Sequence, residues 1–235
     1  AVTFTNKAAA EMRGRIEALL DMPVAHLWIG TFHGLAHRLL RRHWREAGLP
    51  QNFQIIDSDD QLRLIKRLLK NLEIDDSRWV PREIQYFING QKDEGLRPQH
   101  LDDDGDPTRR QMIALYQAYE EVCQRGGLVD FAELLLRSHE LWLHNPTLLG
   151  HYQSRFHNIL VDEFQDTNPT QWRLLLPLLE ELAAGDPERE RSVFLVGDAK
   201  QSIYRFRGAD VSVCKRLATD LAPSADSITL AYNAL

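Results

Sequence analysis

The sequence predicts an α/β fold in which one parallel sheet carries a large, all-helical insertion. Strand and helix patterns alternate at both ends of the 235-residue chain, whereas residues 34–156 show helical patterns almost throughout. The strand patterns are continuous aliphatic runs, which a parallel sheet covered on both faces requires. With 43% hydrophobic residues, the chain can bury a core of this size.

The first alternation of strand and helix lies at the start of the chain. Residues 2–5 (VTFT) have the pattern of a buried strand end, and residues 6–20 predict a helix with Thr5 or Asn6 as its cap. Residues 26–30 (HLWIG) predict a second strand. Because the chain opens within a strand pattern and without a methionine, we expect a fragment of a longer protein.

The middle of the chain shows the apolar spacing of amphipathic helices. Glycines at positions 48, 95, 126 and 127 provide stop signals between the helical patterns. The predicted helices cover residues 32–48, 58–72, 81–95, 108–125 and 130–144.

Alternation returns after residue 156. Strands are predicted at 157–163, 191–198 and 227–230, with helices at 170–182 and near 210–221. Because both ends of the chain contribute strands to one sheet, we predict that residues 1–33 and 157–235 form one domain and that residues 34–156 form its insertion.

Composition excludes several classes of protein. The net charge of −6 argues against a protein coated in basic patches, although a local groove lined with Arg and Lys stays compatible with it. No apolar run approaches the roughly 20 residues that span a bilayer, so no membrane is expected. Cys123 and Cys214 lie far apart without a CxxC, which disfavours a disulfide scaffold or thiolate zinc site and favours a cytoplasmic location.

An acidic cluster directly follows the aliphatic strand within LVDEFQDT (residues 160–167). In open α/β sheets ligands bind at the carboxyl ends of the strands, where Asp162 and Glu163 would project. One of two adjacent acids can hold a hydrated Mg²⁺, and the other can orient or deprotonate a water that attacks a phosphoryl group. The next strand ends similarly, with Asp198 and then Gln201, whose amide could reach the γ-phosphate.

Two other interpretations of these acids stay open at this point. Asp162, Glu163 and Asp166 could simply cap the following helix, whose amino end favours negative charge. A two-metal nuclease also uses clustered carboxylates, but no further acids or histidines stand at an obvious spacing.

Aromatic and basic residues alternate in SIYRFRG (residues 202–208). Tyr204 and Phe206 could stack on bases while Arg205 and Arg207 meet phosphates, an arrangement that binds single strands of any sequence. Ordinary core packing is the usual meaning of an aromatic pair, but core segments seldom alternate rings with charges.

HGLAH (residues 33–37) imitates the HExxH signature of zinc proteases. Gly34 stands where the catalytic glutamate would be, so we do not expect a metal site here.

Five segments resemble, in order and spacing, successive motifs of the UvrD/Rep family of DNA helicases. They are TFTNKAAAEM (3–12), GTFHGLAHRLL (30–40), GLVDFAELL (127–135), LVDEFQDT (160–167) and VGDAKQSIYRFRGAD (196–210). The resemblance implies a RecA-like sheet of the P-loop NTPase type, two motor domains with ATP between them, and ATP-driven 3′ to 5′ movement along single-stranded DNA. This chain would be most of the first motor domain with its helical insertion.

The resemblance also implies roles for individual residues. Asp162 would coordinate Mg²⁺, Glu163 would activate the attacking water, and Gln201 would couple the γ-phosphate of ATP to the DNA. The DNA-binding residues that it implies are Phe4, Thr5, Asn6, Thr31, His33, Tyr204, Phe206 and Arg207. Single-stranded DNA, its junctions with duplex, and repair or recombination proteins are the expected partners.

The sequence also departs from the family pattern. It contains no GxxxxGK[ST] loop, and Ala234 and Leu235 stand where the family has tyrosine and arginine, so this fragment alone is expected to be inactive. The last motif is also similar to the helicase subunits of RecB or AddA type, so a helicase of DNA repair or replication restart and a subunit of a helicase-nuclease both stay open. From another class, a nucleotide-independent module that binds single-stranded DNA is the competing interpretation.

Overall fold

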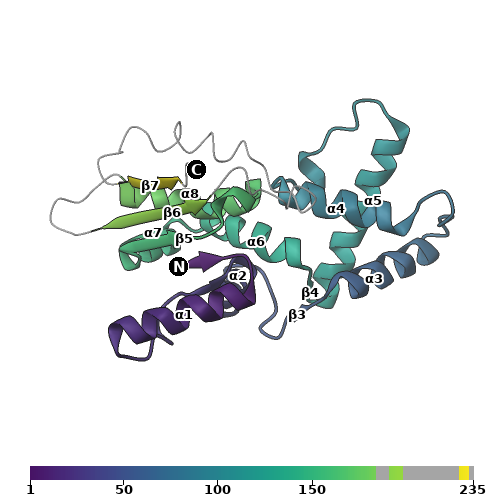
Figure 1. Cartoon of the computed structure of the whole chain (residues 1–235). Coiled ribbons are helices and arrows are strands. Elements are labelled where there is room, and N and C mark those ends of the chain that lie inside the picture. The colour runs from purple at the N-terminus through teal and green to yellow at the C-terminus, as the bar shows by residue number, and fades with distance from the viewer. Residues whose placement is uncertain (184–190, 198–227, 233–235) are drawn as a thin grey trace. The chain divides into compact units, whose positions relative to one another are not determined.

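The computed structural model describes residues 1–183, 191–197 and 228–232 (Figure 1). The chain divides into two compact units. Unit 1 combines Ala1–Leu39 with Ser138–Leu235, and unit 2 is Leu40–Arg137. These units are defined by spatial contacts. The predicted domain boundaries, with residues 34–156 as an insertion, stay a prediction.

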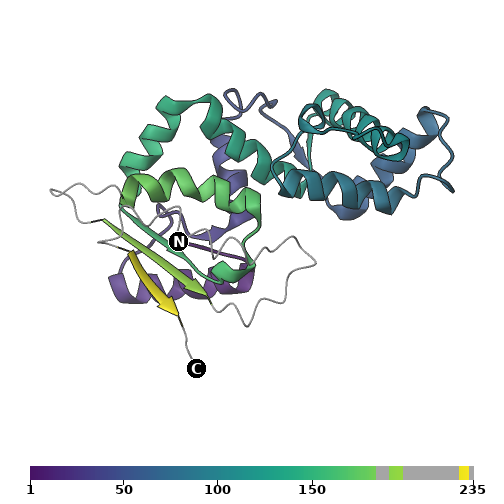
Figure 2. The ribbon, with the colours of Figure 1, turned by 90° about the horizontal axis from the view of Figure 1, so that it is seen from above.

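A parallel sheet forms the centre of unit 1 (Figure 2). Every neighbouring pair of its strands is parallel. This confirms the predicted α/β fold with a parallel sheet. Among the described residues its strands are, in spatial order, β2 (Gly30–Thr31), β1 (Val2–Thr3), β5 (Asn158–Val161), β6 (Ser192–Gly197) and β7 (Ile228–Tyr232).

The predicted strand over residues 26–30 is shorter in the structure. Its ladder with β1 begins at the pair Val2↔Gly30 and continues to Thr3↔Thr31, so only Gly30 and Thr31 have strand partners in β1. The aliphatic and aromatic residues before Gly30 serve packing instead: the Trp28 ring meets Tyr152 edge-on at 5.5 Å between centroids.

Among the described residues, helices lie in the connections from β1 to β6, as parallel pairing requires. The predicted helix over residues 6–20 is confirmed, and Thr5 caps it by accepting a hydrogen bond from Ala8 N at 3.1 Å. The helix predicted over residues 32–48 ends early, at Arg42. The helices that lie wholly or partly in unit 1 are α1 (Asn6–Leu20), α2 (Phe32–Arg42), α6 (Phe131–His144), α7 (Pro146–Arg155), η2 (Phe164–Asp166) and α8 (Pro169–Ala183).

Unit 2 is helical except for one short parallel bridge. The bridge pairs Gln54 with Leu128 and Ile55 with Val129, and it was not predicted. Gly127, with φ of +61°, ends the preceding helix and turns the chain directly into this bridge. The elements are β3 (Gln54–Ile55), α3 (Ser58–Asn71), α4 (Pro81–Asp93), η1 (Pro98–His100), α5 (Pro107–Gly126) and β4 (Leu128–Val129).

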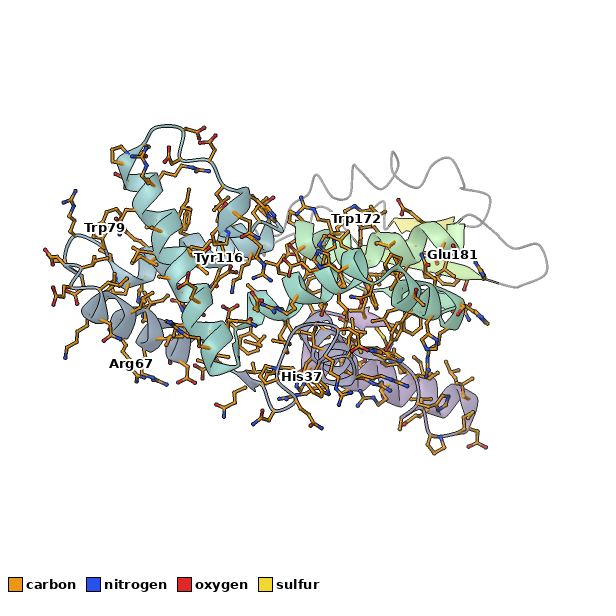
Figure 3. All side chains as sticks on the ribbon, turned by 180° about the vertical axis from the view of Figure 1, so that it is seen from behind. His37, Arg67, Trp79, Tyr116, Trp172 and Glu181 are labelled. Carbon is orange, nitrogen blue, oxygen red and sulfur yellow. The ribbon has the colours of Figure 1, made fainter. Side chains whose placement is uncertain are left out.

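The core of unit 2 lies between α3, α4 and α5. Tyr116, labelled in Figure 3, and Tyr119 are fully buried on α5, and Ile65 and Ile88 reach them from α3 and α4. In the part of the chain that the structure describes, no helix is both long and apolar enough to cross a membrane.

A buried ionic network lies beside this core. Lys92 Nζ contacts Asp130 at 2.7 Å and Glu133 at 3.0 Å, and the Tyr119 hydroxyl donates to Asp130 at 2.8 Å. Arg97 donates to both carboxylate oxygens of Glu133, at 2.8 and 2.9 Å. Asp130 also caps α6 by accepting from Glu133 N at 2.7 Å. The network therefore joins α4, α5 and the start of α6 through charges that are almost fully buried.

Asp93, at the end of α4, provides a test of this buried environment. Burial, followed by the charges of Asp130 and Glu94, raises the pKa of Asp93 to about 7. The folded form then keeps a proton that the unfolded chain has lost, so stability falls as the pH rises from the ordinary value of 3.8 towards 7. We expect Asp93→Asn to stabilise unit 2 by on the order of 1 kcal/mol at pH 8 and by less at pH 5.

Thermal unfolding at the two pH values measures this difference. The exposed Asp76 of the same unit supplies the control, because Asp76→Asn removes an identical charge that water already solvates. An equal gain for both variants at both pH values would contradict a buried origin of the effect.

Candidate functional site

The acidic residues of LVDEFQDT lie at the carboxyl edge of the sheet, after its middle strand. Val161, the last residue of β5, pairs with Val2 on one side and with Leu195 on the other. Asp162 continues the ladder, since its backbone N–H donates to Val2 O at 3.0 Å. Because the strands are parallel, residues that follow β1, β2 and β5 emerge at this same edge.

Glu163 has an unusual backbone conformation. Its φ of 54° and ψ of 38° place it in the left-handed region, which costs a residue with a side chain on the order of 1 kcal/mol. Its N–H donates to Asp162 Oδ1 at 3.1 Å, and η2 begins immediately after it. Strain of this kind is concentrated at functional sites. Among the described residues, Asp21, Glu73 and Asp104 also have a positive φ, but of the four only Glu163 lies in the turn that follows a strand of the sheet.

The Glu163 carboxylate is partly withdrawn from water. Its Oε2 is buried and has no hydrogen-bond partner among the described residues. Burial, then the neighbouring charges of Asp162 and Asp166, raises the pKa of Glu163 above its ordinary value. A raised pKa and an unused acceptor are properties of a carboxylate that can take a proton from a bound molecule.

The helix-capping interpretation of Asp162 and Glu163 does not agree with the structure. Helix α8 begins at Pro169, and its amino end is closed by Asn168 and Gln171. Asn168 N donates to Gln171 Oε1 at 2.9 Å, and Gln171 N donates to Asn168 Oδ1 at 2.8 Å. Asp162 and Glu163 are separated from this cap by the intervening η2 turn.

The predicted DNA-binding residues of the first motif follow β1. Phe4 packs its ring against Phe32 at 5.2 Å between centroids, whereas Thr5 and Asn6 are exposed. Thr5 also has a structural role, because its hydroxyl caps α1. The hydroxyl proton of Thr5 and the side chain of Asn6 stay available at the surface, and Phe4 is partly exposed.

The residues of the second motif lie next to them, after β2. Thr31 pairs with Thr3 across the two strands, and its hydroxyl accepts from Gly34 N at 3.1 Å. His33 is half-buried in the first turn of α2, and burial lowers its pKa, so this imidazole is neutral near pH 7. The structure thus brings the first two motifs and the acidic pair to one edge of the sheet.

Two further buried hydroxyls lie in segments at this edge. Thr3 Oγ1, at the end of β1, and Thr167 Oγ1, directly after η2, have no hydrogen-bond partner among the described residues. Buried polar atoms are nearly always paired, so unpaired ones call for an explanation such as a bound molecule or water. No sequence signal points to Thr3, because a threonine that ends a strand is common.

Several predicted site residues fall beyond the part of the chain that the structure describes. They are Asp198, Gln201, Tyr204, Phe206 and Arg207, together with the helix predicted near 210–221. Their roles stay predictions.

No cluster of three or more His, Cys, Asp or Glu residues suited to a metal ion occurs within residues 1–183, 191–197 and 228–232. A two-metal nuclease centre and a zinc site at His33 and His37 (Figure 3 labels His37) have no ligand set there. A single carboxylate such as Asp162 is compatible with Mg²⁺, which usually keeps several waters and binds one or two carboxylates plus substrate phosphates.

A parallel sheet with acidic residues after its middle strand defines an α/β protein with a candidate ligand site at the carboxyl edge of the sheet. Comparison with known families makes this more specific. Residues 1–222 match the family model of the UvrD/REP helicase N-terminal domain, so the chain belongs to this family. The resemblance seen in the motifs is thereby confirmed.

Individual relatives agree with the family. DNA helicase II of Escherichia coli (strain K12) is 55% identical over 233 residues, which cover 99% of this chain and 31% of the relative. DNA helicase II of Haemophilus influenzae is 49% identical over 237 residues, with 99% and 31% covered. ATP-dependent DNA helicase PcrA of Bacillus subtilis (strain 168) is 36% identical over 234 residues, with 99% and 30% covered. The chain therefore spans about a third of the length of these relatives.

Proposed function

We propose that the protein containing this chain is an ATP-dependent DNA helicase that moves 3′ to 5′ along single-stranded DNA in DNA repair or replication restart. The family match and the names of the relatives support the helicase class. The observation on which the proposal depends is the position of Asp162 and Glu163 after the middle strand, with a strained backbone and an unused carboxylate oxygen at Glu163.

On the nucleotide side, Asp162 would hold Mg²⁺ bound to ATP, and Asp198 would lie nearby. The metal, when bound, neutralises charge on the phosphates. Glu163 accepts a proton from the attacking water, for which its partly desolvated carboxylate is suited. Gln201 contacts the γ-phosphate and relays its loss to the DNA-binding residues.

On the DNA side, Phe4, Thr5, Asn6, Thr31 and His33 contact the single strand. Their location next to the acidic pair supports this assignment, because β1 lies between β2 and β5 in the sheet. Movements of the nucleotide site then reach the DNA through one hydrogen-bonded sheet. A neutral His33 offers a hydrogen bond to a base or sugar rather than a charge to phosphate.

The remaining DNA contacts are assigned to Tyr204, Phe206 and Arg207. Stacking of a base on an aromatic ring contributes roughly 1 to 3 kcal/mol, and it does not depend on the base. We expect Tyr204→Ala combined with Phe206→Ala to weaken binding to single strands about 30-fold or more. Fluorescence anisotropy with oligonucleotides of unrelated sequence measures this loss, and a loss confined to one sequence would contradict stacking as the mode of binding.

Direction and activity are tested together on the full-length protein. ATP hydrolysis is measured with and without single-stranded DNA, and strand displacement is measured on duplexes that carry either a 3′ or a 5′ tail. We expect DNA to stimulate ATP hydrolysis, and we expect strand displacement only on the duplex that carries a 3′ tail. A module that merely binds single strands would hydrolyse no ATP under either condition.

A second candidate is the helicase subunit of a recombination helicase-nuclease. The similarity of residues 196–210 to RecB and AddA subunits favours it. Copurification of a nuclease with the full-length protein distinguishes it from a helicase that acts without one.

A further inference from the structure

The end of β6 approaches the acidic loop at one glycine. A Cβ atom placed on Gly197 would lie 2.7 Å from Gln165 Oε1, 3.1 Å from Gln165 N and 3.4 Å from Phe164 Cβ. The Gln165 side-chain oxygen could turn away from such a Cβ atom, but the contact with the Gln165 backbone N would require the loop or the strand to shift by a few tenths of an ångström. The Gly197 backbone has an ordinary strand conformation, so the constraint is the missing side chain rather than a special φ.

Pairing within the sheet restrains the strand at this contact. β6 is paired on both sides, with Leu195 opposite Val161 of β5 and Gly197 opposite Tyr232 of β7. A displacement of Gly197 would therefore break ladder hydrogen bonds of the sheet.

Buried packing also restrains η2 on its opposite side. Gln165 and Phe164 are buried, with 6% and 5% of their surfaces exposed, and the Phe164 ring meets Trp172 of α8 edge-on at 5.7 Å between centroids. Figure 3 labels Trp172 on that helix. Because Gly197 is paired in the sheet, a methyl group there would press on η2 and displace it by a few tenths of an ångström against this packing.

Such a shift reaches Glu163 directly. η2 starts at Phe164, directly after Glu163. Asp166 N donates to Glu163 O at 3.0 Å, and Thr167 N donates to Phe164 O at 3.2 Å. The hydrogen bond from Asp166 N to Glu163 O therefore ties the left-handed turn at Glu163 to η2.

We propose that Gly197 is a positioning residue, whose lack of a side chain lets η2 lie against β6 and so fixes the carboxylate of Glu163 for hydrolysis. The inference rests on the proposed function for its consequence, whereas the contact itself does not. A misplacement well below 1 Å of a catalytic group slows the chemical step but leaves the binding of substrate largely unchanged.

The test compares Gly197→Ala with Gly150→Ala in the full-length protein. Gly150 lies in α7 of the same unit, and a Cβ there would meet no atom within 4 Å. Both changes reduce the entropy of the unfolded chain equally, so the comparison isolates the contact. We expect Gly197→Ala to lower kcat for DNA-stimulated ATP hydrolysis about tenfold or more. KM for ATP and Kd for single-stranded DNA are expected to stay within about twofold, and Gly150→Ala to match wild type.

Hydrogen exchange supplies a readout that does not depend on activity. The amides of Asp166 and Thr167 should exchange faster in Gly197→Ala than in Gly150→Ala, because their acceptors lie in the displaced turn. An unchanged kcat, or a reduced kcat with unchanged exchange at these amides, overturns the inference. If wild type and Gly150→Ala both lack DNA-stimulated hydrolysis, the proposed function fails instead, and the exchange data still decide the contact.

Discussion

Glu163→Gln is expected to abolish DNA-stimulated ATP hydrolysis in the full-length protein while leaving the binding of single-stranded DNA nearly intact. The amide keeps the size of the side chain but cannot accept a proton from water. General bases contribute roughly 100-fold to 10,000-fold to the rates of enzymes, so kcat should fall by an amount in this range. Steady-state hydrolysis with saturating single-stranded DNA measures kcat, and anisotropy measures DNA binding.

Glu180→Gln is the matched control for this substitution. Glu180 is an exposed residue of α8 in the same unit. Its substitution replaces the same carboxylate by the same amide, but at a position that water solvates. Its kcat should equal that of wild type. Unaltered hydrolysis in Glu163→Gln would exclude Glu163 as the base, and loss of DNA binding would indicate a structural role for the left-handed turn.

Lys92→Met is expected to produce the largest loss of stability in unit 2. Methionine preserves the length of the side chain but removes the ammonium group that contacts Asp130 and Glu133. Burial alone would lower the pKa of Lys92, yet these two carboxylates raise it above its usual value, so the lysine is charged in the folded protein. Removal of one partner from a buried ion pair costs about 3 to 5 kcal/mol, because the opposite charge stays buried.

Hydrogen exchange of the α4 and α5 amides in the full-length protein measures this loss within unit 2. A decrease of about 3 kcal/mol in the free energy of opening of unit 2 accelerates exchange about a hundredfold for the amides that exchange through this opening. Lys66→Met is the control, since Lys66 lies on α3 of the same unit and is exposed. Equal protection in both variants would show that the network contributes little to the stability of unit 2.

Helices with clear caps could be predicted accurately from the sequence, whereas two of the shortest strands could not. The helices over 6–20 and 58–72 were predicted within a residue at each end, because caps such as Thr5 and Asp57 are local signals. The bridge between β3 and β4 was not predicted. Its strands contain two residues each and are far apart in the sequence, so no local periodicity announces them.

For the candidate site, the sequence by itself determined the fold class, the family and the position of Asp162 and Glu163 after a strand. Aliphatic runs and motif spacing are properties of neighbouring residues, and a sequence displays them directly. Only the tertiary structure decided that Glu163 adopts a left-handed backbone, that Asn168 rather than the acidic pair caps α8, and that Gly197 leaves room for Gln165. It likewise decided the role of Asp130, whose partner Lys92 comes from another helix. These features depend on which side chains meet across distant segments, and such contacts are settled by packing of the whole unit rather than by local pattern.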